Sequence, residues 1–471
     1  MKKEMSMNRI FVLLVILLTC FYSCSKKINN PPPSSPGAVV EFNVNHNKVI
    51  STGFAGFGTQ YNQNVYSTIS VTDGINTSNI AQLETKVKAL KSQYVRIFFD
   101  SKAWPTDPNY SATTADFMDS FIKTVKLAQD AGATTINITY WHTATPAQMP
   151  AFADVLKNLI IDQGLTAVRE VTIQNEPNST SMTMDYYRSC YSALDKALNN
   201  LGIRTRVRFV GGDLVQTNQQ DWFTYMATNM SDLLSGYSSH IYWDDNDAAK
   251  PVTRLTDVAN IVKGLDTAIK PVCITEYGVR GGNKTGFPDP GDLTGTNTPI
   301  SQTTISALQN ALFQINGLNL GFAGFIRWDC FKAKYDAGTQ YFSCIGSGTD
   351  GYPLYPLYYM TYLFTHTSQP GWQVVSFTSG STYNSPIVMA VMTNSNASEQ
   401  TVYAINMSSD MVTYTVGGLI PNKKYTVCSF NNKGNGQLEK SYVTTSAAGV
   451  VRNSAISNSL TAITTLDVTL P

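Results

Sequence analysis

The sequence predicts an α/β protein: a (β/α)8 TIM barrel with a C-terminal antiparallel β-sandwich, joined by an N-terminal strand. Three observations lead to this fold class. Between residues 50 and 368, short β-rich segments alternate with amphipathic helical segments, which is typical of a parallel sheet. After residue 369 the helical period disappears, and only short strand-like segments remain. The chain has 471 residues, whereas a barrel of this kind uses roughly 250, so a second domain fits.

The first residues have the pattern of an export signal. Basic side chains precede an apolar run, Ile10 to Leu18, that is too short to span a bilayer comfortably. Ser23-Cys24 then resembles a bacterial lipoprotein cleavage site, so we expect residues 1–23 to be a signal peptide and Cys24 to carry a lipid anchor. Cys20 is a weaker candidate for the anchor, and an ordinary cleaved signal is the alternative. We therefore expect an exported lipoprotein anchored in a bacterial membrane, at the outer membrane or cell surface. The basic residues are Lys2, Lys3 and Arg9.

Two short segments lead from this signal into the globular part. Residues 24–38 are rich in proline and serine, and consecutive prolines favour an extended, semi-rigid tether. In residues 39–49, Val40, Phe42 and Val44 alternate with polar residues, which predicts a strand. We expect that strand to pair with the sandwich and so to join the two domains.

Residues 50–368 carry the predicted barrel. In the helical segment from Ala115 to Ala131, apolar residues recur at spacings of three and four. Eight strand segments in one run favour a closed barrel over an open doubly wound sheet. The strands are expected at 53–58, 94–99, 135–140, 170–174, 207–211, 236–242, 271–275 and 324–328, and helices at 80–90, 115–131, 147–161, 184–201 and 301–318.

Residues 369–471 predict a small antiparallel β-sandwich. Clusters of Gly, Asn and Ser separate short strand segments, and no helical period is present. The expected strands are 374–377, 387–391, 401–405, 412–416 and 425–428.

Composition excludes some classes of partner. Charged residues are only 14% of the chain, the net charge is +1, and no basic stripe is present, so we expect no nucleic-acid partner. A surface poor in charge suits neutral, hydroxyl-rich partners. With four histidines and no metal-ligand spacing, we expect no metal and no cofactor. Cys330 and Cys344 are close in sequence and could form a disulfide, or the cysteines could be buried thiols.

Two glutamates follow predicted barrel strands. Glu176 lies in Gln174-Asn175-Glu176-Pro177 after the fourth strand, and Glu276 lies in Thr275-Glu276-Tyr277-Gly278 after the seventh. Active sites of such barrels form at the C-terminal ends of the strands. Glycoside hydrolysis needs a carboxyl pair of this kind, one to protonate the leaving oxygen and one to attack or to activate water.

At these motifs the chain resembles glycoside hydrolase clan A, and within it most closely family 30. The resemblance extends from Val39 into the sandwich and includes the glycine- and phenylalanine-rich first strand, Ile50 to Gly58, and the hinge from Tyr358 to Val375. Families 5 and 39 share the two glutamate motifs and stay open. Gly211-Gly212-Asp213, at the fifth strand, departs from the family pattern.

The resemblance implies a role for each matching residue. Glu176 would be the general acid and then the general base, and Glu276 the nucleophile of a retaining glycosidase. The resemblance also implies that Arg96 contacts the nucleophile, Asn175 binds the sugar 2-hydroxyl, Tyr242 donates to Glu276, and His240 orients the pair. Aromatic and histidine side chains would line the sugar subsite: Trp328 as its platform, with Trp141 and His142 beside it.

Plainer structural roles stay open for these supporting residues. Arg96 could pair with a helix at the surface, His240 could be a core histidine, and Trp328 and Trp141 could be barrel packing. Asp213 could be a third acid, although a contact to a sugar hydroxyl or a loop cap fits a strand end better.

The expected function is hydrolysis of a β-linked polysaccharide or oligosaccharide, of the xylan, β-glucan or β-galactan type, by a monomer. One alternative is a non-catalytic, surface glycan-binding lipoprotein with a degenerate barrel. Binding alone needs aromatic side chains but not an arginine-supported nucleophile, so the retained residues favour the enzyme. A transglycosidase would use the same residues.

Overall fold

A computed structural model describes residues 39–100, 114–247, 249–265, 270–280, 300–335, 338–339, 342–379, 386–431 and 436–471. The expected signal peptide, Cys24 and the tether lie outside the described residues. In the part of the chain that is described, no helix is long and apolar enough to cross a membrane.

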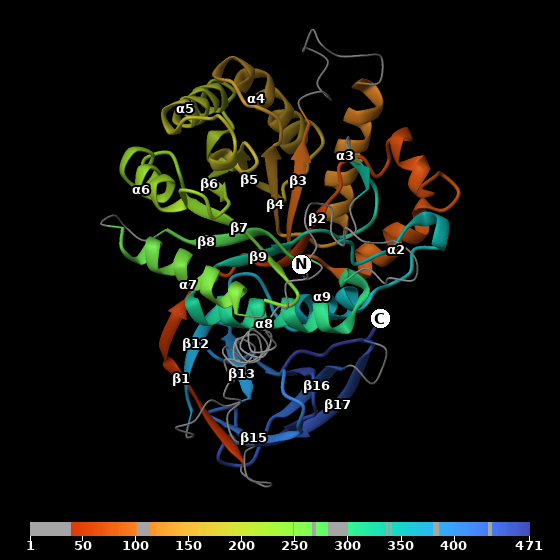
Figure 1. The fold of residues 1–471 in the computed structure, drawn as a ribbon, viewed down its shortest axis with the longest axis vertical. Helices are drawn as coiled ribbons and strands as arrows, with labels where there is room; N and C mark the ends of the chain where they lie inside the picture. Colours follow the sequence, from red (N-terminus) through yellow and green to blue (C-terminus); the bar gives the residue numbers. More distant parts are fainter. Residues whose placement is uncertain are drawn as a thin grey trace, which may run out of the picture. The chain divides into compact units, whose positions relative to one another are not determined.

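The barrel is confirmed. Strands β2 to β9 close in sequence order, and each pairs in parallel with its neighbours (Figure 1). Closure occurs where β2 pairs with β9, Gly56 opposite Gly324. The strands are β2 (Gly56–Tyr61), β3 (Tyr94–Phe99), β4 (Thr135–Tyr140), β5 (Val168–Ile173), β6 (Arg208–Leu214), β7 (Gly236–Asp244), β8 (Val272–Arg280) and β9 (Gly324–Arg327).

Helices alternate with these strands. The five helices expected from periodicity are present, with ends shifted by a few residues, and α4 continues as a π-helical turn over Asn158–Asp162. Three further helices, α6, α7 and α9, were not expected from the strongest apolar periods. The helices are α2 (Ile80–Leu90), α3 (Thr114–Asp130), α4 (Met149–Lys157), α5 (Met184–Asn200), α6 (Gln219–Asn229), α7 (Lys250–Lys263), α8 (Thr304–Leu320) and α9 (Pro356–His366).

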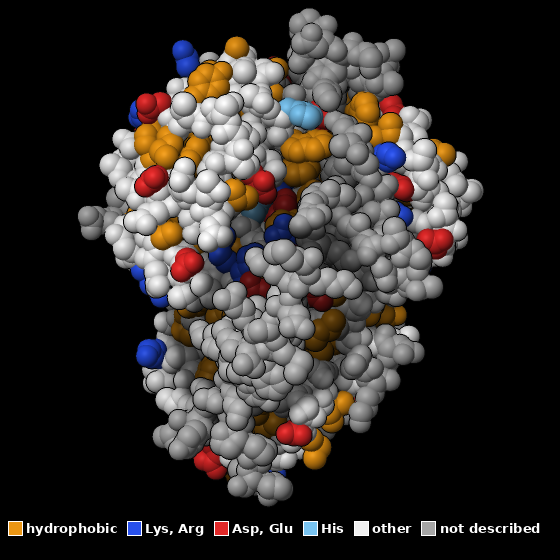
Figure 2. Space-filling model, viewed as in Figure 1, with side chains coloured by type: hydrophobic (Ala, Val, Ile, Leu, Met, Phe, Trp, Pro, Cys, Tyr) orange, Lys and Arg blue, Asp and Glu red, His pale blue; other side chains and the backbone are white. Residues whose placement is uncertain are grey.

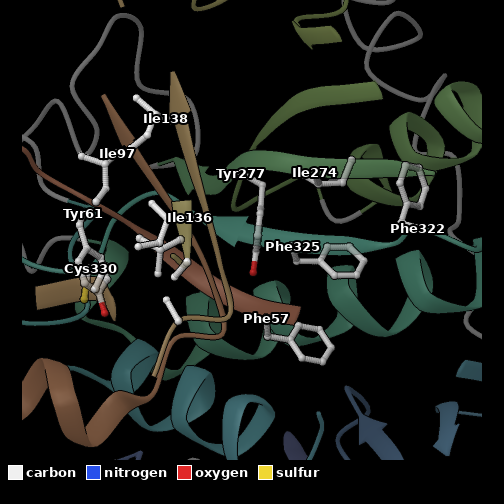
Figure 3. Packing of buried hydrophobic residues seen from close by; sticks show 14 of the residues in the cluster. Phe57, Tyr61, Ile97, Ile136, Ile138, Ile274, Tyr277, Phe322, Phe325 and Cys330 are labelled. Atoms are coloured by element: carbon white, nitrogen blue, oxygen red, sulfur yellow. The ribbon is translucent and has the colours of Figure 1, made fainter. Parts of the chain in front are cut away.

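Side chains along each barrel strand point alternately outward, toward the helices, and inward, into the barrel. Successive strand side chains point to opposite faces, so Ile97 packs toward the helices while Arg96 points into the barrel. Figure 3 shows the apolar side chains that surround the strands. Phe57 of β2 stacks on Phe325 of β9 with ring centroids 5.7 Å apart, and both rings are fully buried. Burying one such ring contributes about 1.5–3 kcal/mol, so this contact helps to close the barrel.

The C-terminal domain is a nine-stranded sheet in the order β17-β16-β19-β14-β13-β12-β1-β15-β18. Its inner face encloses a second apolar core, which agrees with the expected sandwich. The N-terminal strand lies inside this sheet, antiparallel to β12 but parallel to β15. The sheet is therefore mostly antiparallel, as expected, and the pairing of β1 with β15 is parallel. The strands are β1 (Val40–Ser51), β12 (Gln373–Ser379), β13 (Ile387–Thr393), β14 (Gln400–Asn406), β15 (Val412–Gly417), β16 (Lys424–Asn431), β17 (Leu438–Thr444), β18 (Val451–Ala455) and β19 (Ser459–Thr464).

The barrel and the sheet share one continuous apolar core. Helices α8 and α9 lie between the barrel strands and the C-terminal strands (Figure 1). Tyr403 of β14 packs against Phe364 of α9, with ring centroids 4.7 Å apart, and against Phe57 of the barrel. Polar contacts cross the same boundary, since Asn319 Nδ2 donates to the Met389 carbonyl at 2.7 Å. The two domains are therefore packed together rather than linked by a flexible segment.

The described cysteines are free and buried, Cys330 and Cys344 among them. Of the two expectations, buried thiols are therefore the correct one, and no disulfide joins Cys330 to Cys344.

Candidate active site

Glu176 and Glu276 meet at the C-terminal mouth of the barrel. Glu276 lies within β8, and Glu176 lies three residues beyond the end of β5. A carboxylate oxygen of each lies within 4.8 Å of one of the other. Gln174 and Glu176 both have left-handed backbone, with φ of 66° and 48°. Backbone of this kind costs about 1–3 kcal/mol per non-glycine residue and is typical of functional sites.

Arg96 is the central cation of the site. Its side chain is fully buried on β3, and all of its guanidinium N–H groups have acceptors. Nη1 donates to Glu276 Oε2 at 2.7 Å, and Nη2 donates to Asp213 Oδ2 at 2.5 Å. Burial lowers the pKa of Arg96, but the two carboxylates outweigh burial and raise it above its ordinary value. The structure therefore places Arg96 in the site and not at the surface. The remaining acceptors are Gln60 Oε1, Thr139 Oγ1 and Asn175 Oδ1.

Asn175 and Tyr242 also contact the charged groups. Asn175 Oδ1 accepts from Arg96 Nη2 at 2.7 Å, which turns the amide NH2 group away from the arginine. The Tyr242 hydroxyl, at the outer half of β7, donates to Glu276 Oε1 at 2.7 Å. Both oxygens of Glu276 thus accept a hydrogen bond, one from a cation and one from a phenol.

His240 lies between the two glutamates. It is opposite Glu276 in the β7–β8 register. Its Nδ1 lies 3.0 Å from Glu176 Oε1 and 3.9 Å from Glu276 Oε1, and its Nε2 lies 3.4 Å from Asp213 Oδ1. Burial lowers the pKa of His240, but the surrounding carboxylates outweigh it and raise the pKa to about 9. The carboxylates therefore favour the protonated form of this buried ring, which lies in the site between them and is not an isolated core histidine.

Asp213 is fully buried, so it cannot touch a sugar hydroxyl, and it does not cap a loop. The β6–β7 register shifts between Gly211 and Leu214, and Asp213 itself has φ of 55°. Gly212 has φ of 132°, and a Cβ there would lie 2.2 Å from the Ser238 carbonyl oxygen. Only glycine fits, and the bulge it permits turns Asp213 toward Arg96.

Aromatic rings form one wall of the site. Phe98, Trp328 and Phe342 are buried in one cluster, and Trp141 and Tyr242 pack against it half-buried. Trp141 stacks on Phe98 with centroids 5.0 Å apart and planes within 7°. The structure thus brings Trp141 and Trp328 together in one cluster with Tyr242, whose hydroxyl contacts Glu276.

Sequence reasoning missed Phe98, although a signal existed. Phe98 stands two residues after Arg96 on the same strand, and residues two apart point to the same face. The Arg96 guanidinium lies 4.5 Å from the centre of the Phe98 ring. His142, in turn, stacks on Trp141 and lies 2.9 Å from Asp100 Oδ1, farther along the same wall.

The two glutamates differ in exposure. The Glu176 side chain is 27% exposed, whereas that of Glu276 is 9% exposed. Figure 2 shows acidic, basic and histidine side chains gathered in a hollowed area of this face. A ligand from solution therefore meets Glu176 first, with Glu276 deeper and more firmly held.

Glu176, His240 and Glu276 also offer three ligand atoms within 4.8 Å of one another. A metal needs a neutral imidazole nitrogen. Because both nitrogens of His240 face carboxylates and its pKa is raised, a proton competes for that position. We assign no metal to these residues.

A further carboxyl group is buried next to the aromatic wall. Asp329 follows Trp328 and is only 1% exposed. Burial raises its pKa to about 7, against the opposing effects of Ser343 and Arg327. This group is therefore partly protonated at neutral pH.

Solved structures with this fold cover nearly the whole chain. No family model and no curated protein sequence matches it. A GH30 endoxylanase from Clostridium papyrosolvens C71 superposes with a TM-score of 0.61 at 14% identity, covering 91% of this chain and 100% of the other. An α-L-arabinofuranosidase from Thermotoga maritima has a TM-score of 0.63 at 14% identity, over 90% and 99%. A conserved exported protein from Bacteroides fragilis has 0.65 at 13% identity, over 91% and 100%. The chain has the fold of the clan A glycoside hydrolases, with family 30 among its structural neighbours.

Proposed function

We propose that the protein is a retaining glycoside hydrolase that cuts β-linked polysaccharides or oligosaccharides of the xylan, β-glucan or β-galactan type. The observation that carries this proposal is the pairing of Glu176 with Glu276, whose oxygens approach within 4.8 Å. Retaining enzymes separate their carboxyl groups by roughly 5–5.5 Å, whereas inverting enzymes need roughly 6.5–9.5 Å to admit a water.

The surroundings of the pair suit two different roles. Glu276 is held by Arg96 and Tyr242, and a fixed cation favours the ionised form that a nucleophile needs. Glu176 is more exposed and faces one imidazole nitrogen, so it can exchange a proton with a leaving group or with water. We assign Glu276 as the nucleophile and Glu176 as the acid/base.

The reaction then takes two steps. In the first, a Glu276 oxygen bonds to the anomeric carbon, the glycosidic C–O bond breaks, and the Glu176 proton passes to the leaving oxygen. In the second, water attacks the same carbon, its proton passes to Glu176, and the bond to Glu276 breaks. Two inversions at one carbon give net retention.

Three further residues fit the sugar in this scheme. The Asn175 amide, oriented by Arg96, donates to the 2-hydroxyl. Trp328 and Trp141 provide apolar surface for the pyranose C–H face. A glycan-binding protein would need these rings, but it would gain nothing from burying an arginine against a carboxylate, since buried ion pairs carry a desolvation cost.

The test is a panel of polysaccharides with the sizes of the products measured. We expect wild-type protein to release oligosaccharides from xylan, β-glucan or β-galactan, and Glu276→Gln to release none. An aryl α-L-arabinofuranoside belongs in the panel because some of the structural neighbours are arabinofuranosidases. Binding of a glycan without any product from wild type would contradict the proposal and favour the binding protein.

We further propose that the protein is exported and held at a bacterial membrane through Cys24. The support is the order of basic residues, apolar run and Ser23-Cys24 in the sequence.

A further inference from the structure

Asp213 makes more contacts than a loop residue needs. Its side chain is fully buried. Oδ2 accepts from Arg96 at 2.5 Å, and Oδ1 accepts from Thr275 Oγ1 at 2.5 Å and from Ser238 Oγ at 2.9 Å. The Ser238 hydroxyl also accepts from the Asp213 backbone N–H at 2.7 Å. The carboxylate is thus locked in position by three side chains.

Arg96 and His240 both contact Asp213, and each also contacts a different glutamate. Arg96 contacts Asp213 through Nη2 and Glu276 through Nη1. His240 faces Asp213 through Nε2, at 3.4 Å, and Glu176 through Nδ1, at 3.0 Å. Asp213 is therefore the shared partner of two residues that each hold one member of the catalytic pair.

We propose that Asp213 is a positioning residue that fixes Arg96 and keeps His240 an imidazolium, so that both glutamates stay in their reactive geometry. This role rests on the proposed glycosidase function of Glu176 and Glu276.

The charge of the Asp213 side chain supports the proposal. Burial raises the pKa of Asp213, but Arg96 and His240 outweigh burial and hold the pKa well below its usual range. The carboxylate is thus a permanent anion at working pH. The charged groups that face His240 are Glu176, Asp213 and Glu276, and Arg96 is hydrogen-bonded to Asp213 and Glu276.

A protonated His240 would serve the acid/base step. A ring N–H donated to Glu176 favours the carboxylate that remains after proton transfer. Without Asp213, the carboxylates near His240 would be Glu176 and Glu276. In the proposed reaction Glu176 gains and loses a proton, and Glu276 forms a covalent bond. Asp213 takes part in no bond change, so its charge stays constant throughout the cycle.

The experiment compares Asp213→Asn with wild type by two independent measurements. The first is the titration of the His240 ring by NMR, which four histidines in the chain make assignable with His→Gln variants. Removing an opposite charge at this distance should lower the midpoint by roughly 1–3 units. The second is steady-state kinetics on the best glycan of the panel. We expect kcat to fall roughly 10- to 100-fold, as for other small misplacements, with KM nearly unchanged.

Ser238→Ala is the matched control. It removes one hydrogen bond to Asp213 but keeps the carboxylate, so the His240 midpoint should stay near wild type and kcat should fall less. The same midpoint in Asp213→Asn as in wild type would overturn the proposal, as would an unchanged kcat.

Two outcomes separate this proposal from the proposed function. If wild type cleaves no glycan, the glycosidase proposal fails, while the NMR titration still tests the pairing of Asp213 with His240. If Asp213→Asn does not fold, wild type alone decides, since a His240 midpoint at or below about 6.5 would overturn the positioning role.

Discussion

The Tyr242 hydroxyl donates a 2.7 Å hydrogen bond to Glu276 Oε1, on the opposite side of the carboxylate from Arg96. Glu276 is thus held by two donors, a guanidinium and a phenol. In the mechanism that we propose, one Glu276 oxygen bonds to the sugar and loses its charge, so the hydrogen bonds must keep the carboxylate in place.

Tyr242→Phe should therefore slow the enzyme without unfolding it. A hydrogen bond to a charged group contributes about 1.5–3 kcal/mol, which corresponds to roughly 10- to 100-fold in rate. We expect that loss in kcat/KM on a polysaccharide substrate. Trp243→Phe is a control, because Trp243 lies on the outer side of β7, bonded to Gln309. A smaller loss in Tyr242→Phe than in Trp243→Phe would argue against the role of the hydroxyl.

The two glutamates should fail differently when each is replaced by alanine. With Glu276→Ala no glycosyl-enzyme forms, and azide attacking an aryl β-glycoside should give the α-azide. With Glu176→Ala and a good leaving group, the first step survives while deglycosylation slows, and azide should restore turnover and give the β-azide. Proton NMR of the products distinguishes these cases. For wild type it should show the β-anomer first, and an initial α-anomer would indicate inversion.

Asp329 should make the protein less stable as pH rises. Its pKa is about 7 in the folded protein and about 3.9 in an unfolded chain. Its contribution to stability is therefore complete below about pH 4 and is lost as pH rises through 7, because the folded state holds a proton that the unfolded state releases. Each pKa unit corresponds to about 1.4 kcal/mol.

Asp329→Asn removes this titration. We expect the free energy of unfolding of wild type, relative to Asp329→Asn, to fall between pH 4 and pH 8 in urea titrations. His240 also titrates in part of this range, but it does so in both proteins. A constant difference between the two proteins would show that Asp329 is ionised when folded.

Tyr403 should couple the unfolding of the two domains. Its ring is fully buried against Phe364, and its hydroxyl lies 2.9 Å from Thr367 Oγ1. Tyr403→Ala should lower the free energy of unfolding by about 3–5 kcal/mol, as for other buried aromatic rings. Tyr403→Phe should cost only about 1 kcal/mol. Both variants should unfold in one transition, and separate barrel and sheet transitions would contradict the shared core.

Cys24→Ala should release the protein from membranes or block its processing. The expectation follows from the sequence around Ser23-Cys24. Membrane fractionation of cells that express each form, with Cys20→Ala as the control, measures it. If Cys24→Ala stays in the membrane fraction and Cys20→Ala leaves it, the anchor is Cys20.

Local pattern was enough to predict most of the barrel. β3 and β4 have the bounds expected from sequence, because every residue of both strands is buried and β-branched or aromatic residues fill most positions. Helix α6, Gln219–Asn229, escaped notice since it buries Trp222 and Phe223 amid polar residues and has no aliphatic repeat. β17 escaped notice for a related reason, because it pairs only with β16 and is mostly exposed.

The glutamates of the site could be predicted because they are adjacent to strand ends in the sequence. The position of Asp213 could not, because it depends on a bulge in β6 and on the distant Ser238 and Thr275. Contacts of this kind join residues that no local period relates. Sequence reasoning therefore placed both glutamates in one site together with Arg96 and Tyr242, but it did not place the buried Asp213 carboxylate against Arg96.

The place of β1 in the middle of the sheet sets an order of events during synthesis. Phe42 emerges from the ribosome early, yet its partner Ser379 lies near the other end of the chain, as does Val416. The sheet cannot be completed until almost the entire polypeptide is available, and pairings this distant in sequence form slowly. A nascent chain with its first strand unsatisfied stays incompletely folded for most of its translation, and it must be kept from aggregating through that edge until its last hundred residues arrive.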